Sequence, residues 1–493
     1  MKDTLRLLVI GDSHYAGDTD TPLWDRQVQY GLEFVKRVFR RIDAGDRPDV
    51  IILLGDLLND GLAQGAAKDL SEIRKTAEAT GIETIFVPGN HDADYNLFFS
   101  ATGDGPGVHI IKDFILYSFT DPYGEGDVCT RREEDLEKFR AVARKHPDKK
   151  IIALQHNPVY PAIESEYPYN FTNSEHIHSA YAENRVTLSL SGHYHPGQEL
   201  AYRDGVGYFT VPALCTEPFR YNVIDIAAGG INIRTGSLKN PLRLADNHCH
   251  TQFAYCAEDV TVEAVLKRAE TLGLSYVCFT EHSGQLYLST ADYWGHRFFH
   301  DPDLMPEARK KGADRIAAFR KAVAESGSPL ARVGMEIESD AYGGITLLPE
   351  DSDGLDLIIG AVHVLPDELL SAPAARLHSE FMKTSESLMK HGIAVLAHPF
   401  RFYHRGKLPA PKHLYGDMAK TLKAHGVAAE MNFHTNRPDP EFFSACVQEG
   451  VKISLGTDTH NLLEAGDFHR HIELLKMIGV TEDMLDRILF TLS

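Results

Sequence analysis

The chain has 493 residues, of which 43% are hydrophobic and 24% are charged. This is the composition of an ordinary globular protein, and it excludes a collagen, a coiled-coil rod and a disordered chain. The length predicts about two to four domains. Acidic residues outnumber basic residues by 70 to 50, which gives a formal net charge of -20. Such a charge argues against binding along a nucleic-acid backbone.

The chain contains six cysteines, too few for a fold built on disulfides, and no two of them form a CxxC pair. No apolar run reaches the roughly 18 residues that a membrane span needs. The first residues, MKDTLRLLVIGDSH, lack the pattern of a signal peptide. We therefore expect a cytoplasmic protein, and the sequence indicates no particular oligomeric state. Histidine is abundant, with 25 residues.

The first half of the chain alternates strand and helix patterns. An amphipathic helix is predicted over residues 24–42. Apolar runs predict five strands that each end in Gly, Asn, His or Asp, at residues 4–12, 49–56, 81–92, 149–158 and 185–195. In an open α/β sheet, ligands bind beyond the carboxyl ends of the strands. Shorter runs predict an antiparallel second sheet, at residues 205–214, 221–230 and 231–236.

The alternation begins again after a linker predicted at residues 234–243. Seven further apolar runs predict a barrel of the (βα) type, with polar residues at the strand ends where barrel chemistry occurs. The runs are residues 242–248, 274–282, 331–339, 355–363, 393–399, 427–433 and 451–460. The fold class is therefore α/β, with predicted domains at residues 1–238 and 242–493.

One cluster of polar side chains follows the strands of the first half. Seven of these side chains are candidate metal ligands: Asp12, His14, Asp56, Asn90, His156, His193 and His195. Oxygen and imidazole ligands in this mixture suit Mn, Fe or Zn, and seven suffice for two ions if one carboxylate bridges them. A single motif of this kind is more often a turn or a helix cap. Five motifs in chain order favour a metal centre.

This series of motifs resembles the calcineurin-like metallophosphoesterase family over about residues 5–235. The resemblance implies a four-layer α/β sandwich with two metals bridged by Asp56. His91 would then donate a proton to the leaving oxygen, and Asp92 would orient His91. The forms LQHNP and SGHYH look closest to the cyclic-nucleotide phosphodiesterase branch. The remaining ligands would be Asp12, His14 and His195 for one metal, and Asn90, His156 and His193 for the other.

A second cluster follows the strands of the second half. Residues i and i+2 of a strand share a face, so His248 and His250 can bind one ion together, and Asp458 and His460 can both point into the barrel mouth. A buried cluster of this kind is costly unless a cation compensates it. One such histidine alone is more often an ordinary core or surface residue. Several at successive strand ends, together with Glu336, favour metal binding.

The second half resembles the PHP (polymerase and histidinol phosphatase) family, in its trinuclear histidinol-phosphatase-like branch. The resemblance implies a distorted (β/α)7 barrel with two or three metals. The branch commonly has histidine where this chain has Cys256, so the third site either binds a softer metal or is empty. The implied ligands are His248, His250, Glu336 and Asp458 for the first metal, Glu336, His363 and His398 for the second, and Cys256, His282 and His460 for the third.

Three further residues are candidate substrate contacts. Arg401 follows the strand that ends in His398 and could hold a phosphate through two hydrogen bonds, although a surface arginine is the commoner case. Asn432 and His434 follow the next strand and face the predicted mouth. The alternative for both is a role in capping the turn that follows.

These observations predict a bifunctional, metal-dependent phosphoric ester hydrolase. It would cleave small phosphomonoesters or phosphodiesters, nucleotide-like or sugar phosphates, by metal-bound hydroxide at two separate sites. One domain could open a diester and the other remove the resulting monoester. A DNA repair or exonuclease-type nuclease is an alternative, against which the acidic charge and the lack of a basic run argue. In a further alternative one domain is catalytic and the other, more plausibly the PHP half, is regulatory.

Overall fold

The computed structural model describes residues 4–19, 23, 25–42, 47–92, 94–103 and 105–492. The chain forms two compact units, Met1–Lys239 and Asn240–Ser493. Within the described ranges, no helix combines the length and the apolar character that crossing a bilayer requires.

The first unit contains a five-stranded sheet in the order β11-β10-β1-β2-β3. The strands β1, β2 and β3 are parallel, and β10 and β11 are antiparallel to their neighbours. Every residue of β2 is buried, as expected of a strand covered on both faces. The bounds are β1 Leu5–Ile10, β2 Val50–Leu54, β3 Thr84–Val87, β10 Arg220–Ala227 and β11 Gly230–Ser237.

A second, six-stranded sheet of this unit has the order β4-β5-β6-β7-β9-β8. Its central strands β5, β6, β7 and β9 are parallel, and β4 and β8 pair antiparallel at the two edges. The bounds are β4 Gly107–Ile111, β5 Phe114–Ser118, β6 Lys150–Leu154, β7 Val186–Ser191, β8 Gln198–Arg203 and β9 Val206–Thr210.

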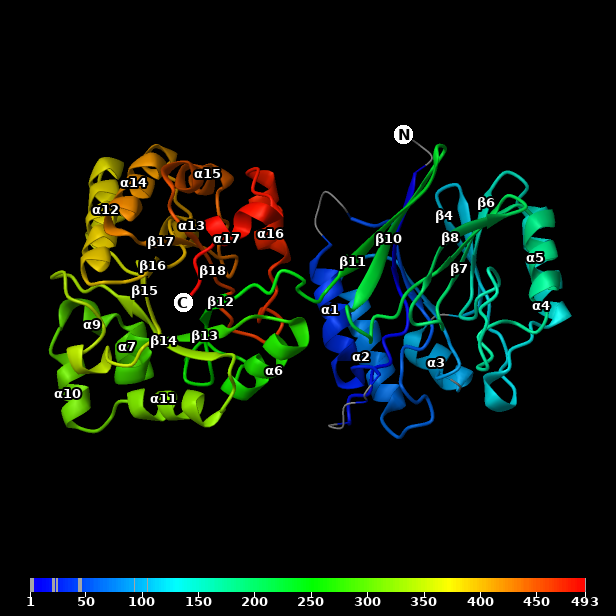
Figure 1. Cartoon of the computed structure of the whole chain (residues 1–493), viewed down its shortest axis with the longest axis horizontal. Helices are drawn as coiled ribbons and strands as arrows, with labels where there is room; N and C mark the ends of the chain where they lie inside the picture. Colours follow the sequence, from blue (N-terminus) through cyan, green and yellow to red (C-terminus); the bar gives the residue numbers. More distant parts are fainter. Residues whose placement is uncertain are drawn as a thin grey trace. The chain divides into compact units, whose positions relative to one another are not determined.

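The two sheets pack face to face, because one apolar cluster joins Val9 and Ile52 of the first sheet to Leu116 and Ile152 of the second. Helices cover the outer faces, and Figure 1 shows α1 and α2 beside the first sheet and α4 and α5 beside the second. This arrangement confirms the expected sandwich. The helices are α1 Gly31–Arg40, α2 Ala66–Glu78, α3 Tyr95–Thr102, α4 Glu133–Lys145 and α5 Ser174–Glu183.

Two expectations about this unit need correction. The runs at residues 205–236 do not form a separate antiparallel sheet. The β10–β11 hairpin extends the first sheet through β1, and β9 joins the second sheet parallel to β7. Local patterns indicate a strand but not its partner, which is chosen by the long-range packing of the two sheets. The helix was expected to begin at residue 24, but α1 begins at Gly31. Trp24 itself lies outside the described residues.

The second unit contains seven parallel strands in sequence order, from β12 to β18. Cys249 forms an isolated parallel bridge with Thr459, and the amide of Asp458 donates to the carbonyl of His248 at 2.7 Å, so the sheet is nearly closed. All seven predicted strands are present, which confirms the barrel-like fold. The bounds are β12 Asp246–Cys249, β13 Val277–His282, β14 Ala331–Glu338, β15 Leu357–Ala361, β16 Val395–Leu396, β17 Ala428–Met431 and β18 Ile453–Leu455.

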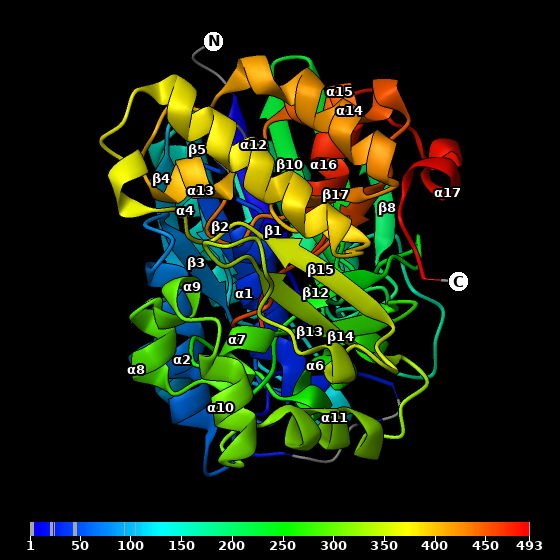
Figure 2. The same ribbon diagram turned by 90° about the vertical axis from the view of Figure 1, so that its left-hand side faces the viewer.

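Helices surround these strands. In Figure 2, α12 and α14 lie on one side of β12 to β15, and α7, α10 and α11 lie on the other. The segment after His282 is largely helical, since it contains four short helices. The bounds are α6 Val262–Leu272, α7 Ser283–Tyr287, α8 Thr290–Trp294, α9 Arg297–His300, α10 Leu304–Lys310, α11 Ile316–Glu325, α12 Ala374–Lys390, α13 Arg401–Arg405, α14 Tyr415–His425, α15 Pro440–Glu449, α16 His469–Met477 and α17 Leu485–Ile488.

Candidate metal centres

The carboxyl ends of β1, β2, β3, β6 and β7 bring the first cluster together around Asp56. The Oδ2 atom of Asp56 lies 3.2 Å from His156 Nε2 and 3.5 Å from His14 Nε2. His195 Nε2 lies 3.2 Å from His14 Nε2 and 3.7 Å from Asp12 Oδ1. Asp56 therefore lies where a carboxylate that bridges two ions would be needed.

Some buried polar atoms in this cluster are unpaired. Among the described residues, Asn90 Oδ1 and His193 Nε2 have no hydrogen-bond partner. A buried polar atom without a partner typically costs about 1–3 kcal/mol. Carbonyl oxygens and imidazole nitrogens are also the lone-pair donors that bind transition ions. The residues present therefore fit a metal centre.

The protonation of the cluster follows from burial and from its own charges. Burial raises the pKa of Asp12 to about 8 and lowers the pKa of His193 to about 3. Burial would also lower the pKa of His156, but the Asp56 carboxylate raises it to about 9. Burial acts against ionisation of Asp56, yet the charge of His156 holds its pKa well below the usual range. In the absence of an ion, protons therefore neutralise part of the cluster.

The loops that carry these ligands have strained backbone. Asp12, His14, Asp56 and His193 have φ values of 52°, 44°, 48° and 69°. Residues with a Cβ rarely adopt this left-handed region, and such strain concentrates at functional sites. Close packing also requires Gly89, because a Cβ at this position would lie 2.2 Å from Asp56 Oδ1.

His91 and Asp92 lie beside the cluster, but they do not interact as expected. The backbone N–H of His91 donates to Asp56 Oδ1 at 2.9 Å, and His91 Nδ1 lies 2.7 Å from the carbonyl oxygen of Asn59. The carboxylate of Asp92 accepts backbone N–H groups, from Leu57, Leu58 and Gly89. The carbonyl of Asn59, and not Asp92, therefore orients the His91 ring. Asp92 instead holds the loop that carries Asp56.

Sequence reasoning missed Cys215 in the first unit. Its Sγ atom lies in one group with ligand atoms of His14 and His195, all within 4.8 Å of one another. Burial raises the pKa of the Cys215 thiol well above its usual range, which opposes the thiolate form that binds metals. No local motif marks this cysteine, because only the tertiary fold brings it to the cluster.

The second cluster is centred on Glu336, which is fully buried two residues before the end of β14. Its Oε1 atom lies 2.9 Å from His398 Nε2 and 3.4 Å from His363 Nε2. Its Oε2 atom lies 3.5 Å from His248 Nε2 and 3.7 Å from His250 Nε2. Burial opposes ionisation of Glu336, but the surrounding imidazoles, His282 foremost, hold its pKa well below the usual range.

Asp458 completes this arrangement from the end of β18. Its Oδ1 atom lies 3.0 Å from His250 Nε2 and 3.5 Å from His248 Nε2. Asp458 and His398 also have positive φ values, of 53° and 31°. The four side chains expected to bind the first metal of this half therefore lie together, as do the three expected to bind the second.

Cys256 lies with His282 and His460 at the edge of the second cluster. Its Sγ atom is 3.1 Å from His460 Nε2. Burial alone would raise the pKa of Cys256, but hydrogen bonds from His282 and His460 lower it to about 4. The thiolate is the form that binds zinc or iron.

Carboxylates hold the far side of the ligand histidines in the second cluster. His248 Nδ1 lies 2.7 Å from Glu430 Oε1, and His363 Nδ1 lies 2.8 Å from Glu338 Oε1. Such partners fix the ring orientation and make the ligand nitrogen more basic. Sequence reasoning missed Glu430 and Glu338. The sequence did contain a signal for Glu338, because it follows Glu336 by two residues on one strand and therefore shares its face.

The three candidate substrate contacts also lie at this cluster. Arg401 is buried, and its guanidinium donates to Asp458 Oδ2 at 2.5 Å and lies 2.8 Å from His363 Nε2. The Asn432 amide donates to Asp458 Oδ2 at 3.2 Å. The His434 ring stacks on His460, with centroids 4.2 Å apart. Arg401 is thus not a surface residue, and Asn432 orients a candidate ligand.

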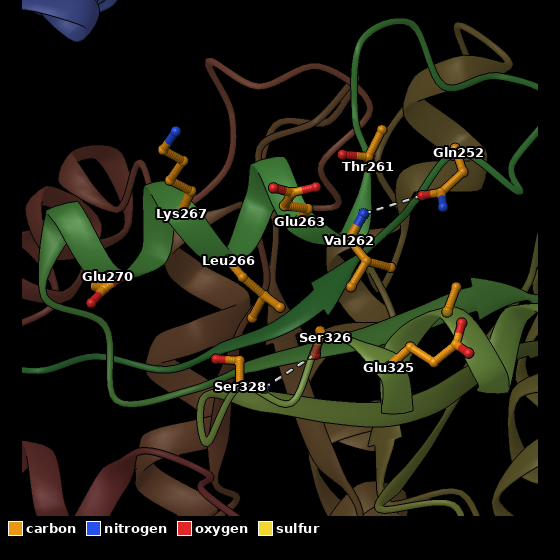
Figure 3. Close-up of a pocket in the computed structure, with 11 residues that line it drawn as sticks. Gln252, Thr261, Val262, Glu263, Leu266, Lys267, Glu270, Glu325, Ser326 and Ser328 are labelled. Atoms are coloured by element: carbon orange, nitrogen blue, oxygen red, sulfur yellow. Dashed lines mark hydrogen bonds between the residues drawn. The ribbon is translucent and has the colours of Figure 1, made fainter. Parts of the chain in front are cut away.

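A separate pocket of about 700 Å³ lies in the second unit between α6 and the end of α11 (Figure 3). Glu263, Glu270 and Glu325 line it, together with Lys267. These carboxylates oppose the binding of a phosphate group. Among the described residues, none of the candidate ligands lines this pocket. Phosphate chemistry therefore belongs at the strand ends.

Two family models match the chain. The calcineurin-like phosphoesterase model matches residues 5–197, and the PHP domain model matches residues 246–434. The chain joins a calcineurin-like phosphoesterase domain to a PHP domain. Both families are metal-dependent, and the chain is a metal-dependent phosphoric ester hydrolase.

Relatives with curated names match about half of the chain. The cAMP/cGMP dual specificity phosphodiesterase MT0825 of Mycobacterium tuberculosis (strain CDC 1551 / Oshkosh) is 22% identical over 245 residues, 47% of this chain and 73% of the relative. Probable phosphatase Teth514_1060 of Thermoanaerobacter sp. (strain X514) is 23% identical over 252 residues, 49% of this chain and 88% of the relative. A dimetal phosphatase from Danio rerio superposes with a TM-score of 0.41 and 14% identity, over 48% of this chain and 96% of that one.

Replacing Glu430 with Gln should weaken metal binding in the second cluster. The substitution keeps the volume of the side chain but removes the charge that faces His248 Nδ1. Loss of such a partner typically costs about 10- to 100-fold in metal affinity. Equilibrium dialysis with Mn²⁺ measures the dissociation constant in a full-length chain that also carries Asp56→Asn, a substitution meant to abolish metal binding by the first cluster. The exposed Glu449→Gln is the control, and an unchanged dissociation constant in Glu430→Gln would contradict the assigned role.

Proposed function

We propose that this chain hydrolyses small phosphate esters at two separate centres, one in residues 1–238 and one in residues 242–493. One observation supports this most strongly. Each unit contains a buried carboxylate with imidazole nitrogens gathered around it. Two imidazoles contact Oδ2 of Asp56, and imidazoles contact both carboxylate oxygens of Glu336. A bridging carboxylate is what a centre for two ions requires, and phosphoryl transfer is the chemistry that such centres perform.

In the first centre, we assign the ions to Asp12, His14, Asp56, Asn90, His156, His193 and His195. Bound Mn, Fe or Zn would supply Lewis-acid activation of water and of the phosphoryl oxygens. The contact with the Asn59 carbonyl places a proton on His91 Nδ1, so a second proton, carried on Nε2 in the imidazolium form, would be the one given to the leaving oxygen. The mycobacterial relative is named as a cAMP/cGMP phosphodiesterase, which supports a phosphodiester as the substrate of this centre.

In the second centre, we assign the ions to His248, His250, Glu336, His363, His398 and Asp458. Arg401 contacts Asp458 and His363, so its positive charge lies where a phosphate at this centre would be held. The ring of His434 lies at the mouth, where it can contact the organic part of a phosphomonoester. The relative from Thermoanaerobacter is named as a probable phosphatase, which supports a monoester substrate.

We also propose that Cys256, His282 and His460 bind a third ion in the second centre. Cobalt substitution tests this, because a thiolate bound to Co²⁺ gives a charge-transfer band in the near ultraviolet. The band should appear in full-length protein that carries Asp56→Asn and should disappear when Cys256→Ser is added. The Asp56→Asn background removes any contribution from Cys215. A band of unchanged intensity after Cys256→Ser would contradict the third site.

The two centres would act in sequence on one substrate, with the first opening a diester and the second releasing phosphate from the monoester. Asp56→Asn should leave a cyclic or linear diester intact, and Glu336→Gln should accumulate the monoester. Time courses by ³¹P NMR resolve diester, monoester and free phosphate in one experiment. Complete conversion of the diester to free phosphate by either variant would show that the relay is wrong.

A further inference from the structure

Three tyrosines gather beside the first centre. The Tyr169 ring meets the His193 ring edge-on at a centroid distance of 5.3 Å, and the Tyr167 ring lies 5.6 Å from His193. Tyr194 extends the group, with its ring 5.1 Å from Tyr169. Tyr194 lies between two candidate ligands in the sequence, and the other two belong to the segment between β6 and α5. We call Tyr167, Tyr169 and Tyr194 the tyrosine wall.

The wall is not needed to hold this segment in place. The Asn170 side chain bonds both the N–H and the carbonyl of Ile163, at 2.9 and 2.8 Å, and the Asn157 amide donates to the Tyr169 carbonyl at 2.9 Å. These contacts close the segment through its backbone. The Tyr167 hydroxyl donates to Asp127 at 2.8 Å, which orients the ring without burying it.

The wall remains open to solvent. Tyr167 is 38% exposed, and Tyr169 and Tyr194 are partly exposed. Exposed tyrosines that cluster against the candidate ligand His193 offer apolar ring faces beside the centre at which a phosphate would bind. Aromatic faces stack on planar rings with little dependence on the identity of the ring.

We infer that the tyrosine wall binds the planar base of a nucleotide-like ester whose phosphate lies at the first centre. This inference rests on the proposed function of that centre and names the class of its substrate. The exposed carboxylates of Glu164 and Glu166 precede the wall. They repel a continuing phosphate backbone, so the ligand is a single nucleotide unit and not a polymer.

The test compares two five-membered cyclic diesters, 2′,3′-cyclic AMP and glycerol 1,2-cyclic phosphate, of which only the first carries a base. Full-length protein with Glu336→Gln confines turnover to the first centre. In this background, Tyr167→Ala with Tyr169→Ala should lower kcat/KM for 2′,3′-cyclic AMP about 10- to 100-fold. The value for glycerol 1,2-cyclic phosphate should not change. Tyr167→Phe with Tyr169→Phe should retain most activity on both, because the ring faces remain.

Tyr202→Ala is the matched control, since Tyr202 is a 58% exposed tyrosine on β8 of the same unit. An equal loss on both substrates would show a structural role, and no loss on either would show that the wall does not bind the base. Both results overturn the inference and leave the proposed function standing. If the Glu336→Gln protein with all three tyrosines intact hydrolyses neither diester, the proposed function of the first centre fails, and this inference fails with it.

Discussion

Both centres depend on one electrostatic constraint, which is that carboxylates and imidazoles buried together need their charges compensated, by bound protons or by a metal cation. Asp12, Glu336 and Asp458 are fully buried. Hydrogen bonds pair some of the buried polar atoms in these clusters. Within the described residues, each cluster still contains buried acceptor atoms without a hydrogen-bond partner. Removing such groups from water costs several kcal/mol per charge unless the charge is matched. The apolar strands that surround each cluster exclude water from its carboxylates and imidazoles. Because these groups are buried, their charges must be compensated within the protein, and bound metal ions can do this.

The two folds meet this constraint in the same way despite their different topologies. Parallel strands deliver their last side chains to one edge of a sheet, or to one end of a barrel. The residues that follow leave the strand abruptly, and several ligands adopt left-handed backbone conformations. Each such residue costs about 1–3 kcal/mol, which the surrounding packing must offset. Carboxylates such as Glu430 and Glu338 then fix the histidine rings from behind, so that the ligand atoms are oriented before an ion arrives.

The sequence predicted those features that leave a local pattern. Apolar runs ending in Asp, Asn or His located the strands of both units, and the structure brings their terminal side chains together. Features that depend on tertiary partners were not predictable. The β10–β11 hairpin chooses its sheet through long-range register, and His91 is held by a backbone carbonyl, which has no sequence signature. Arg401 resembles a surface residue in sequence, and only the nearly closed barrel shows that it is buried.

The central claim is that each unit binds transition ions through its own bridging carboxylate. Elemental analysis of full-length protein, purified without chelators, tests it most directly when the parent chain is compared with Asp56→Asn and Glu336→Gln. The account predicts transition ions in the parent chain, with each substitution removing the ions of one centre and leaving those of the other. A parent chain free of transition ions, or a metal content that neither substitution changes, would contradict it.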